Sequence, residues 1–315
     1  MTLQTENALV FNTTAARHAP LAMGIDIARY AGFEGIETTA TKVCDYLAAD
    51  HSISDLLSAL GGLPIYGIGT ILDAERHGDD ALSLVADART ICELAHSVGA
   101  KGVQVINGPL DYREVIRFRE GKPKVGYRGV LAYNDEERIE ITAANLKLLA
   151  QIAQEFNLIV YLEALAWSPV NSLAQQLELL RRADQDNLKI VIDYWHCYIS
   201  GDLPEDVAKI DCALIFGVHV CDSLPYSGGV PDETVLRDVP TGMGVIDQKE
   251  WTDAVKATGY KGWWCAETFC QRLQQKNSYE VAKQMKSQLT ALVSDQILAV
   301  RHPCPPGTAT RDPGG

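Results

Sequence analysis

The chain has few basic residues for its length and no long hydrophobic run. Its 315 residues include 28 Lys and Arg against 41 Asp and Glu, which gives a formal net charge of −13 at pH 7. An acidic surface repels polyanions, so this balance disfavours binding to nucleic acid or to an anionic membrane surface. No apolar run approaches the roughly 18 residues that a membrane span needs, so we expect no membrane association.

Export and disulfide signals are also missing. The first residues, MTLQTENALVFNTT, lack a basic start followed by an apolar stretch, so we expect no export signal. The eight cysteines show no CxxC spacing, and several stand inside apolar runs, where a reduced thiol packs as a small hydrophobe. We therefore expect a cytoplasmic protein.

The sequence does contain a regular alternation of short apolar segments and segments with helical periodicity. Most of the apolar segments are apolar throughout, which is typical of parallel strands covered by helices on both faces. The predicted strands cover residues 8–14, 35–39, 65–71, 101–107, 158–164, 189–195, 214–220 and 263–269. Helices are expected between them, for example at 77–100 and 134–157.

Eight strand–helix units in a chain of this size predict an α/β fold, the (β/α)8 TIM barrel. A doubly wound open sheet is the alternative, but no glycine-rich phosphate turn follows the first strand, which favours the barrel. We expect one catalytic domain over residues 1–300 and a disordered, Pro- and Gly-rich tail over 301–315. Two segments, 108–133 and 221–247, exceed ordinary loop length and are expected to build the site or its lid.

Ligand-type residues stand at the carboxyl ends of the last four predicted strands. We call Glu163, Asp193, His219 and Glu267 the strand-end cluster. Each alone could cap a helix, pair with a base or bond within the core, but in a barrel the four ends meet on one side, where three carboxylates repel one another without a cation. The cluster therefore predicts a site for one divalent metal ion. Mn²⁺ is the expected ion, with Mg²⁺, Co²⁺ and Fe²⁺ as alternatives, while Zn²⁺ is less expected with one histidine and no thiolate.

Other residues near the predicted strand ends are candidates for substrate binding. His196 follows Asp193 by three residues and either bonds a substrate oxygen or caps the next helix. Glu37 either binds a substrate hydroxyl or serves as a cap or an ion-pair partner, and Asn107 is a candidate for a hydrogen bond to substrate. Trp167 either forms an apolar wall for a sugar ring or packs in the core.

Several motifs together resemble the xylose-isomerase-like TIM barrels. They are AGFEGIET (31–38), YLEAL, VIDYWH, HVCDS, RDVPTGMGVID (237–247), GYKGW and WWCAETF. This superfamily includes ketose 3-epimerases, inosose isomerases and dehydratases, hydroxypyruvate isomerase and endonuclease IV. The resemblance spans residues 8–295 and is specific for the superfamily rather than for one reaction.

The resemblance also implies roles for individual residues. The strand-end cluster matches the four metal ligands of the superfamily, and Glu163 and Glu267 match its two catalytic carboxylates. His196 matches a contact to a substrate oxygen, and Arg237 matches an arginine that often reaches the substrate in the dehydratase-like branch. Ketose 3-epimerases typically have an arginine where this chain has Pro225, which puts a plain 3-epimerase in doubt.

A divalent ion beside two carboxylates suits proton abstraction next to a carbonyl. The ion would stabilise the enediolate, and the carboxylates would act as base and acid. We therefore predict a metal-dependent isomerase or epimerase that acts on a small sugar, keto-sugar or polyol.

Two alternatives stay open at this point. One is a lyase on an oxidised sugar, either a keto-inositol dehydratase or a C-glycoside-cleaving subunit that acts on a 3-oxo-glycoside. The other is a non-catalytic barrel that keeps the metal for stability. The expected assembly is a homo-oligomer or a complex with a small partner subunit.

Overall fold

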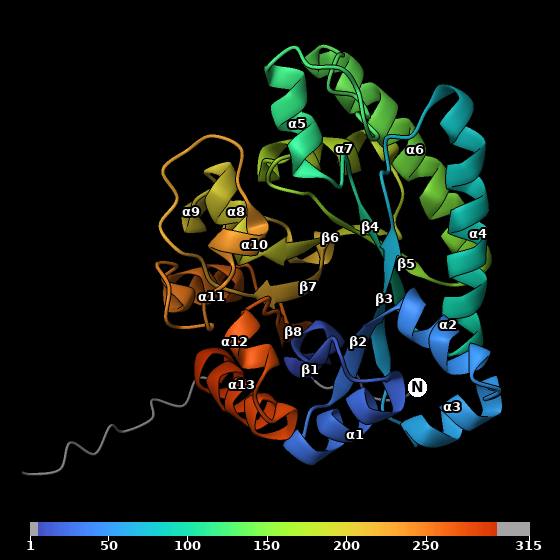
Figure 1. The fold of residues 1–315 in the computed structure, drawn as a ribbon, viewed down its shortest axis with the longest axis vertical. Coiled ribbons are helices and arrows are strands. Elements are labelled where there is room, and N and C mark those ends of the chain that lie inside the picture. The colour runs from blue at the N-terminus through green and yellow to red at the C-terminus, as the bar shows by residue number, and fades with distance from the viewer. Residues whose placement is uncertain (1–5, 295–315) are drawn as a thin grey trace, which may run out of the picture.

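A computed structural model describes residues 6–294, whose strands form a closed parallel barrel (Figure 1). Each strand pairs with the next one in the chain, and β1 pairs with β8 to close the sheet. The strands are β1 (Ala8–Asn12), β2 (Gly35–Thr39), β3 (Ile65–Ile71), β4 (Gly102–Ile106), β5 (Ile159–Glu163), β6 (Leu188–Asp193), β7 (Ile215–Val220) and β8 (Trp263–Ala266). The prediction of a TIM barrel is confirmed.

Helices surround the strands, as the outer ring in Figure 1 shows. The longer helices are α1 (Leu21–Ala31), α2 (Ala40–Ala48), α3 (Ile53–Leu60), α4 (Ala81–Ser97), α5 (Tyr112–Arg119), α6 (Asp135–Glu155), α7 (Leu173–Ala183), α8 (Tyr194–Ser200), α11 (Gln248–Ala257) and α13 (Ser278–Val293). The shorter ones are α9 (Pro204–Val207), α10 (Glu233–Leu236), α12 (Gln271–Gln274) and the 3-10 helices η1 (Thr13–Ala16), η2 (Gly78–Asp80) and η3 (Cys212–Leu214).

The long helix α6 shows how local sequence sets an element. The Asn134 side chain accepts a hydrogen bond from the Glu137 N–H, and the Glu137 carboxylate accepts one from the Asn134 N–H. This reciprocal pair satisfies backbone donors that a helix start leaves free. Further along, Ile139, Leu146 and Leu149 are buried in the main hydrophobic core.

Several strands end earlier than the apolar runs predicted. The predicted strand at 189–195 ends at Asp193, because the Asp193 carboxylate accepts a hydrogen bond from His196 N at 2.8 Å and so begins α8. The predicted strand at 263–269 ends at Ala266, which places Glu267 just past β8. Asp193 is thus the last residue of β6 and Glu267 lies just past β8, both at the carboxyl end of the barrel.

Aromatic side chains fill the amino-terminal part of the barrel interior. Tyr66 and Trp263 are almost fully buried and form a small cluster with the half-buried Phe216. Gly217 faces this cluster, and a Cβ there would lie 2.1 Å from the Trp263 ring, so the packing requires glycine. The space for chemistry therefore lies at the other end, where α5 and α10 occupy part of the segments 108–133 and 221–247.

Some predictions reach beyond what this structure tests. The proposed tail at 301–315 lies outside the described residues, so the domain limits at 1–300 stay a prediction. Among the described helices, none combines the length and the apolar character that a membrane crossing requires. A cytoplasmic location and a partner chain also stay predictions.

Candidate metal centre and active-site cavity

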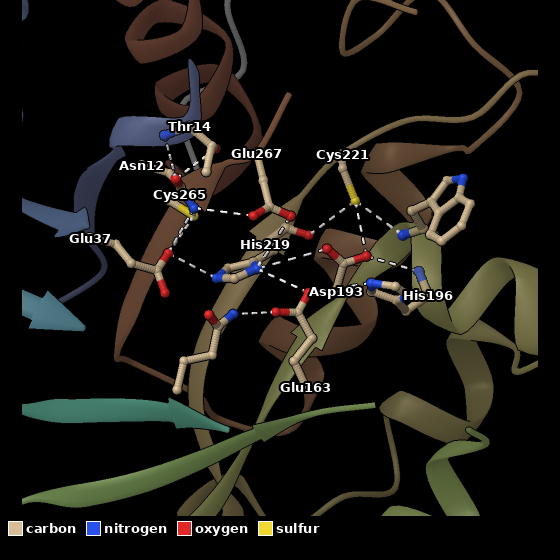
Figure 2. A network of polar contacts seen from close by, with 12 residues as sticks. Asn12, Thr14, Glu37, Glu163, Asp193, His196, His219, Cys221, Cys265 and Glu267 are labelled. Carbon is tan, nitrogen blue, oxygen red and sulfur yellow. Dashed lines mark hydrogen bonds and ion pairs between the residues drawn. The ribbon is translucent and has the colours of Figure 1, made fainter. Parts of the chain in front are cut away.

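The strand-end cluster converges on one point at the carboxyl end of the barrel (Figure 2). Its four members are buried, and one ligand atom from each lies within 4.8 Å of all the others. The imidazole stands in the middle, because His219 Nδ1 is 3.6 Å from Glu163 Oε1, 3.8 Å from Asp193 Oδ2 and 3.7 Å from Glu267 Oε2. The structure thus brings together the four residues that the strand ends predicted.

The electrostatics of this cluster favour a cation at its centre. His219 Nδ1 is buried and has no hydrogen-bond partner among the described residues. Burial alone would lower the pKa of His219, but Glu37 and the other nearby acids raise it well above its usual value. Burial also raises the pKa of Glu267 to about 8. Three oxygen ligands and one nitrogen ligand fit a divalent ion. Such an ion would give His219 Nδ1 a partner and would offset the repulsion between the carboxylates.

Glu37 contacts the ring nitrogen of His219 that points away from the strand-end cluster and so fixes the orientation of the imidazole. Its Oε2 atom lies 3.0 Å from His219 Nε2 and accepts a hydrogen bond from Asn12 Nδ2 at 2.9 Å. The Tyr161 hydroxyl donates to Glu37 Oε1 at 2.7 Å. Such a carboxylate behind a histidine leaves the other ring nitrogen free for a metal. Glu37 does not line the cavity described below, so its contacts match the ion-pair alternative rather than a substrate contact.

Asp193 is held by donors on both of its oxygens. Oδ1 accepts from His196 N and lies 3.2 Å from the Cys221 thiol, while Oδ2 lies 3.4 Å from Arg237 Nη2. Burial would raise the pKa of Asp193, but the Arg237 guanidinium and the two histidines lower it overall. Asp193 therefore combines a helix cap with a ligand-type carboxylate.

Arg237 lies against the carboxylates rather than free in the cavity. It is only 2% exposed, and its Nη2 donates to Glu267 Oε2 at 2.7 Å while Nη1 donates to Glu233 Oε1 at 2.9 Å. Its guanidinium also stacks 4.4 Å from the centre of the Phe269 ring. Arg237 thus offsets part of the negative charge, and it still lines the cavity.

A side-chain relay holds Glu163 from the opposite side. The Thr70 hydroxyl donates to Gln104 Oε1 at 2.8 Å, and Gln104 Nε2 donates to Glu163 Oε2. The other oxygen, Oε1, lies 3.5 Å from His196 Nε2. Because His196 Nδ1 accepts from Ala166 N at 3.0 Å, the proton of a neutral imidazole sits on Nε2 and faces the cavity.

A cavity of about 640 Å³ opens above the cluster. The residues that line its inner part include Gln104, Glu163, Trp167, His196, Arg237 and Glu267. Asn107 is not among the lining residues, because its side chain donates to Val170 O and accepts from Leu165 N at 2.9 Å. The amide of Asn107 therefore holds the backbone after β5 and has little left for a substrate.

Comparison with known proteins agrees with this geometry. Residues 25–290 match the protein family described as xylose isomerase-like TIM barrel. The chain belongs to this family. Because the match covers most of the barrel, the resemblance found in the sequence motifs is confirmed.

Two proteins with similar sequences are described as enzymes. An inosose isomerase of Halalkalibacterium halodurans is 28% identical over 149 residues, which are 46% of this chain and 52% of the isomerase. A 3-dehydroshikimate dehydratase of Pseudomonas aeruginosa is 33% identical over 131 residues, or 41% of this chain and 20% of the dehydratase. The chain thus spans about half the length of the isomerase and a fifth of the dehydratase.

Solved structures share the fold of this family member. A structure described as the IOLI protein with a bound zinc atom superposes with a TM-score of 0.78 and 20% identity, over 91% of this chain and 98% of that one. An L-ribulose 3-epimerase superposes with a TM-score of 0.67 and 18% identity, over 91% of this chain and 94% of that one.

The sequence analysis did not predict the residues that hold the Glu163 carboxylate in place or that line the rest of the cavity. Gln104 interrupts the apolar sequence GVQVI of β4. A polar residue within such a strand could have indicated a side chain that faces the site. Tyr112 and Tyr127 of the segment 108–133 also line the cavity, but their contacts depend on how that segment folds back over the barrel. Trp167 is buried in the hydrophobic core and also lines the cavity, so its contacts fit both of its predicted alternatives.

Proposed function

We propose that this chain is a divalent-metal-dependent isomerase or epimerase that acts on a small sugar or polyol by moving a proton next to a carbonyl. The observation that carries the proposal is the convergence of the strand-end cluster, two of whose carboxylates also line the cavity. The similarity to an inosose isomerase over about half of its length supports the same class of reaction.

The strand-end cluster would hold the ion. We propose Mn²⁺, with Mg²⁺, Co²⁺, Fe²⁺ or Zn²⁺ as alternatives, since the cluster offers three carboxylates and one imidazole. When bound, a divalent ion polarises a substrate carbonyl and stabilises the negative charge that develops beside it.

The two carboxylates that line the cavity would exchange a proton with the substrate. Glu163 reaches in from the end of β5 and Glu267 from just past β8, with His219 between them. Gln104 holds Oε2 of Glu163, and this carboxylate would take the proton from the substrate carbon. Glu267 is paired with Arg237 and would return a proton to the same or the neighbouring carbon.

Two further residues would position the substrate. His196 would donate from Nε2 to a substrate oxygen, because its other nitrogen is already bonded to the backbone. Trp167 would present an apolar face to the carbon side of a sugar ring. Arg237 would contribute positive charge at the edge of the site.

A lyase on an oxidised sugar is the second candidate. The similarity to a 3-dehydroshikimate dehydratase, at 33% identity, favours it. The same first step applies, since a proton next to a carbonyl is removed by one carboxylate. If a hydroxyl stands on the adjacent carbon, the second carboxylate would protonate it as it leaves.

Incubation of the Mn²⁺-supplemented protein in D₂O with ketoses, inososes and 3-oxo-glycosides separates these candidates. For an isomerase or epimerase, we expect deuterium to be incorporated into a recovered sugar, which proton NMR detects as the loss of a proton signal. Formation of an unsaturated product or release of an aglycone would instead establish the lyase.

The variant Glu163→Gln tests the role of this carboxylate. Loss of a general base costs about 10²–10⁴-fold in rate, so exchange should fall by that factor. The matched control is Glu140→Gln on the exposed face of α6, which should keep full activity. If no panel compound exchanges and Glu163→Gln changes only thermal stability, the non-catalytic barrel is the correct reading.

A further inference from the structure

Part of the cavity wall comes from connecting segments rather than from the strand-end cluster, and we call the space beside this wall the outer part. This part is built by the connecting segments 108–133 and 221–247 and by the turn after β8. Its lining residues include Leu110, Tyr112, Arg113, Tyr127, Glu233 and Phe269. The two segments are linked across it, because the Tyr112 hydroxyl donates to Asp232 Oδ2 at 2.6 Å.

The volume of the cavity exceeds the needs of one sugar ring. A six-carbon sugar has about 12 non-hydrogen atoms, and each takes less than the roughly 30 Å³ that a water molecule occupies in the liquid. Such a ring therefore fills at most ~360 Å³ by the same allowance. The cavity measures about 640 Å³, so a ring bound at the cluster leaves the outer part open.

The charges that line the cavity argue against a phosphate. Arg113 is paired with Asp111, with contacts of 2.8 and 2.9 Å between the guanidinium and the carboxylate. Arg237 is already held by Glu267 and Glu233. These are the two arginines among the lining residues, and both are neutralised, so no free cation is offered to an anion there.

The remaining surface of the outer part suits an aromatic or apolar group. Tyr112 and Trp167 meet edge to face, with their ring centres 6.3 Å apart. The Trp167 Nε1–H donates to Pro109 O at 2.8 Å, so the indole is fixed before any ligand arrives. Leu110 adds an apolar side chain that is 47% exposed. Preformed aromatic corners of this kind bind flat rings at low entropic cost.

We propose that the natural substrate is a keto-sugar or keto-polyol ring that carries an uncharged aromatic or apolar substituent. The ring would lie at the strand-end cluster and against Trp167, and the substituent would extend past Trp167 to Leu110 and Tyr112. This inference rests on the proposed function for the identity of the ring. It adds that a free monosaccharide or a sugar phosphate is a poorer ligand than a substituted ring.

Calorimetric titration of the full chain in Mn²⁺ with glucose, phenyl β-glucoside and glucose 6-phosphate tests the inference. The phenyl glucoside should bind at least about tenfold more tightly than glucose, since burying an aromatic group contributes more than ~1.4 kcal/mol. Glucose 6-phosphate should bind no more tightly than glucose. Equal affinities, no binding of the phenyl glucoside, or a preference for the phosphate would overturn the proposal.

The variant Leu110→Asp locates the effect. It should reduce the affinity for phenyl β-glucoside at least about fivefold and leave that for glucose unchanged, because a charge against an aromatic ring is unfavourable. Val125→Asp is the matched control, since Val125 is 73% exposed in the same segment and does not line the cavity. An equal effect of both variants on the phenyl glucoside would overturn the assignment of this surface.

These titrations and the exchange experiment fail independently. Loss of deuterium exchange with every panel compound would refute the proposed reaction, whatever the binding preference. A confirmed reaction without any preference for the phenyl group would refute only the outer binding surface.

Discussion

Single residues around Glu163 set the direction in which its carboxylate points. Gln104 donates to Oε2, and Thr70 holds the other end of the Gln104 amide. Hydrogen bonds to charged groups contribute about 1.5–3 kcal/mol, so this relay restricts Glu163 to one orientation. The free oxygen, Oε1, then faces His196 and the centre of the cluster.

We therefore predict that Gln104→Leu lowers kcat for proton exchange by about 10–100-fold and changes KM by less than about threefold. The reason is that Glu163 would lose its fixed orientation while the other cavity residues stay in place. Deuterium-exchange kinetics over a range of substrate concentrations measure both constants.

Two further variants make this prediction specific. Thr70→Val should act in the same direction with a smaller effect, and Thr70→Ser should restore the activity. Gln154→Leu on the exposed side of α6 is the control for a loss of polarity. A purely structural role for Gln104 would instead lower the thermal stability and leave kcat of the folded protein intact.

The strand-end cluster could be predicted from sequence because each member follows an apolar run, where a lone charge is costly. The contacts of Glu37 and Asn107 could not be predicted in the same way. Both also stand at strand ends, but Glu37 turns toward His219 and Asn107 toward the backbone after β5. Sequence position gives the end of the barrel but not the direction of the side chain.

At the scale of elements, the segment 108–133 is tied to the barrel by Glu75, which lies after β3. Glu75 Oε2 accepts a hydrogen bond from Gly108 N at 2.8 Å, and Oε1 has no partner among the described residues. Burial raises the pKa of Glu75 to about 7, and nearby Asp73 adds to the shift. Glu75 therefore holds a proton in the folded chain at pH values where it is ionised in the unfolded chain.

This difference predicts a pH dependence of stability. The raised pKa means that the folded state binds more protons than the unfolded state above pH 4.5, so the free energy of unfolding falls as the pH rises toward about 7. A difference of roughly 2.5 pKa units corresponds to about 3 kcal/mol. Glu75→Gln should remove this loss, so its Tm should exceed that of the wild type increasingly from pH 5 to pH 8.

Thermal unfolding of the two proteins at pH 5, 6.5 and 8 checks this prediction, with Glu140→Gln as an exposed control. Parallel curves for wild type and Glu75→Gln across the range would contradict it.

The elements themselves were predictable to different degrees. Strands and long helices follow from apolar runs and helical periodicity, as β3 and α6 show. Helix α5 was not predicted within 108–133, because its sequence YREVIRFR is dominated by charged residues. Its start depends on Asp111, whose side chain accepts from Arg113 N and begins the helix locally.

At the scale of the whole molecule, the barrel was predictable because eight apolar segments recur at spacings that fit a helix between them. The outer part of the cavity could not be predicted from the sequence. It depends on the contact between Tyr112 and Asp232, which are 120 residues apart. Such a contact leaves no local pattern in the sequence.

A divalent ion held by the strand-end cluster is the central requirement of the proposed function. The direct measurement is a Mn²⁺ titration of wild type and Asp193→Asn, followed by metal analysis after removal of free ion. Asparagine keeps an oxygen that can accept from His196 N, so the fold should be retained in the variant. We predict one ion per wild-type chain and at least about 100-fold weaker binding by the variant, because loss of an outer-shell partner alone costs about 10–100-fold and Asp193 is itself a proposed ligand. A wild-type chain that binds no ion, or a folded variant that binds Mn²⁺ as tightly as the wild type, would contradict it.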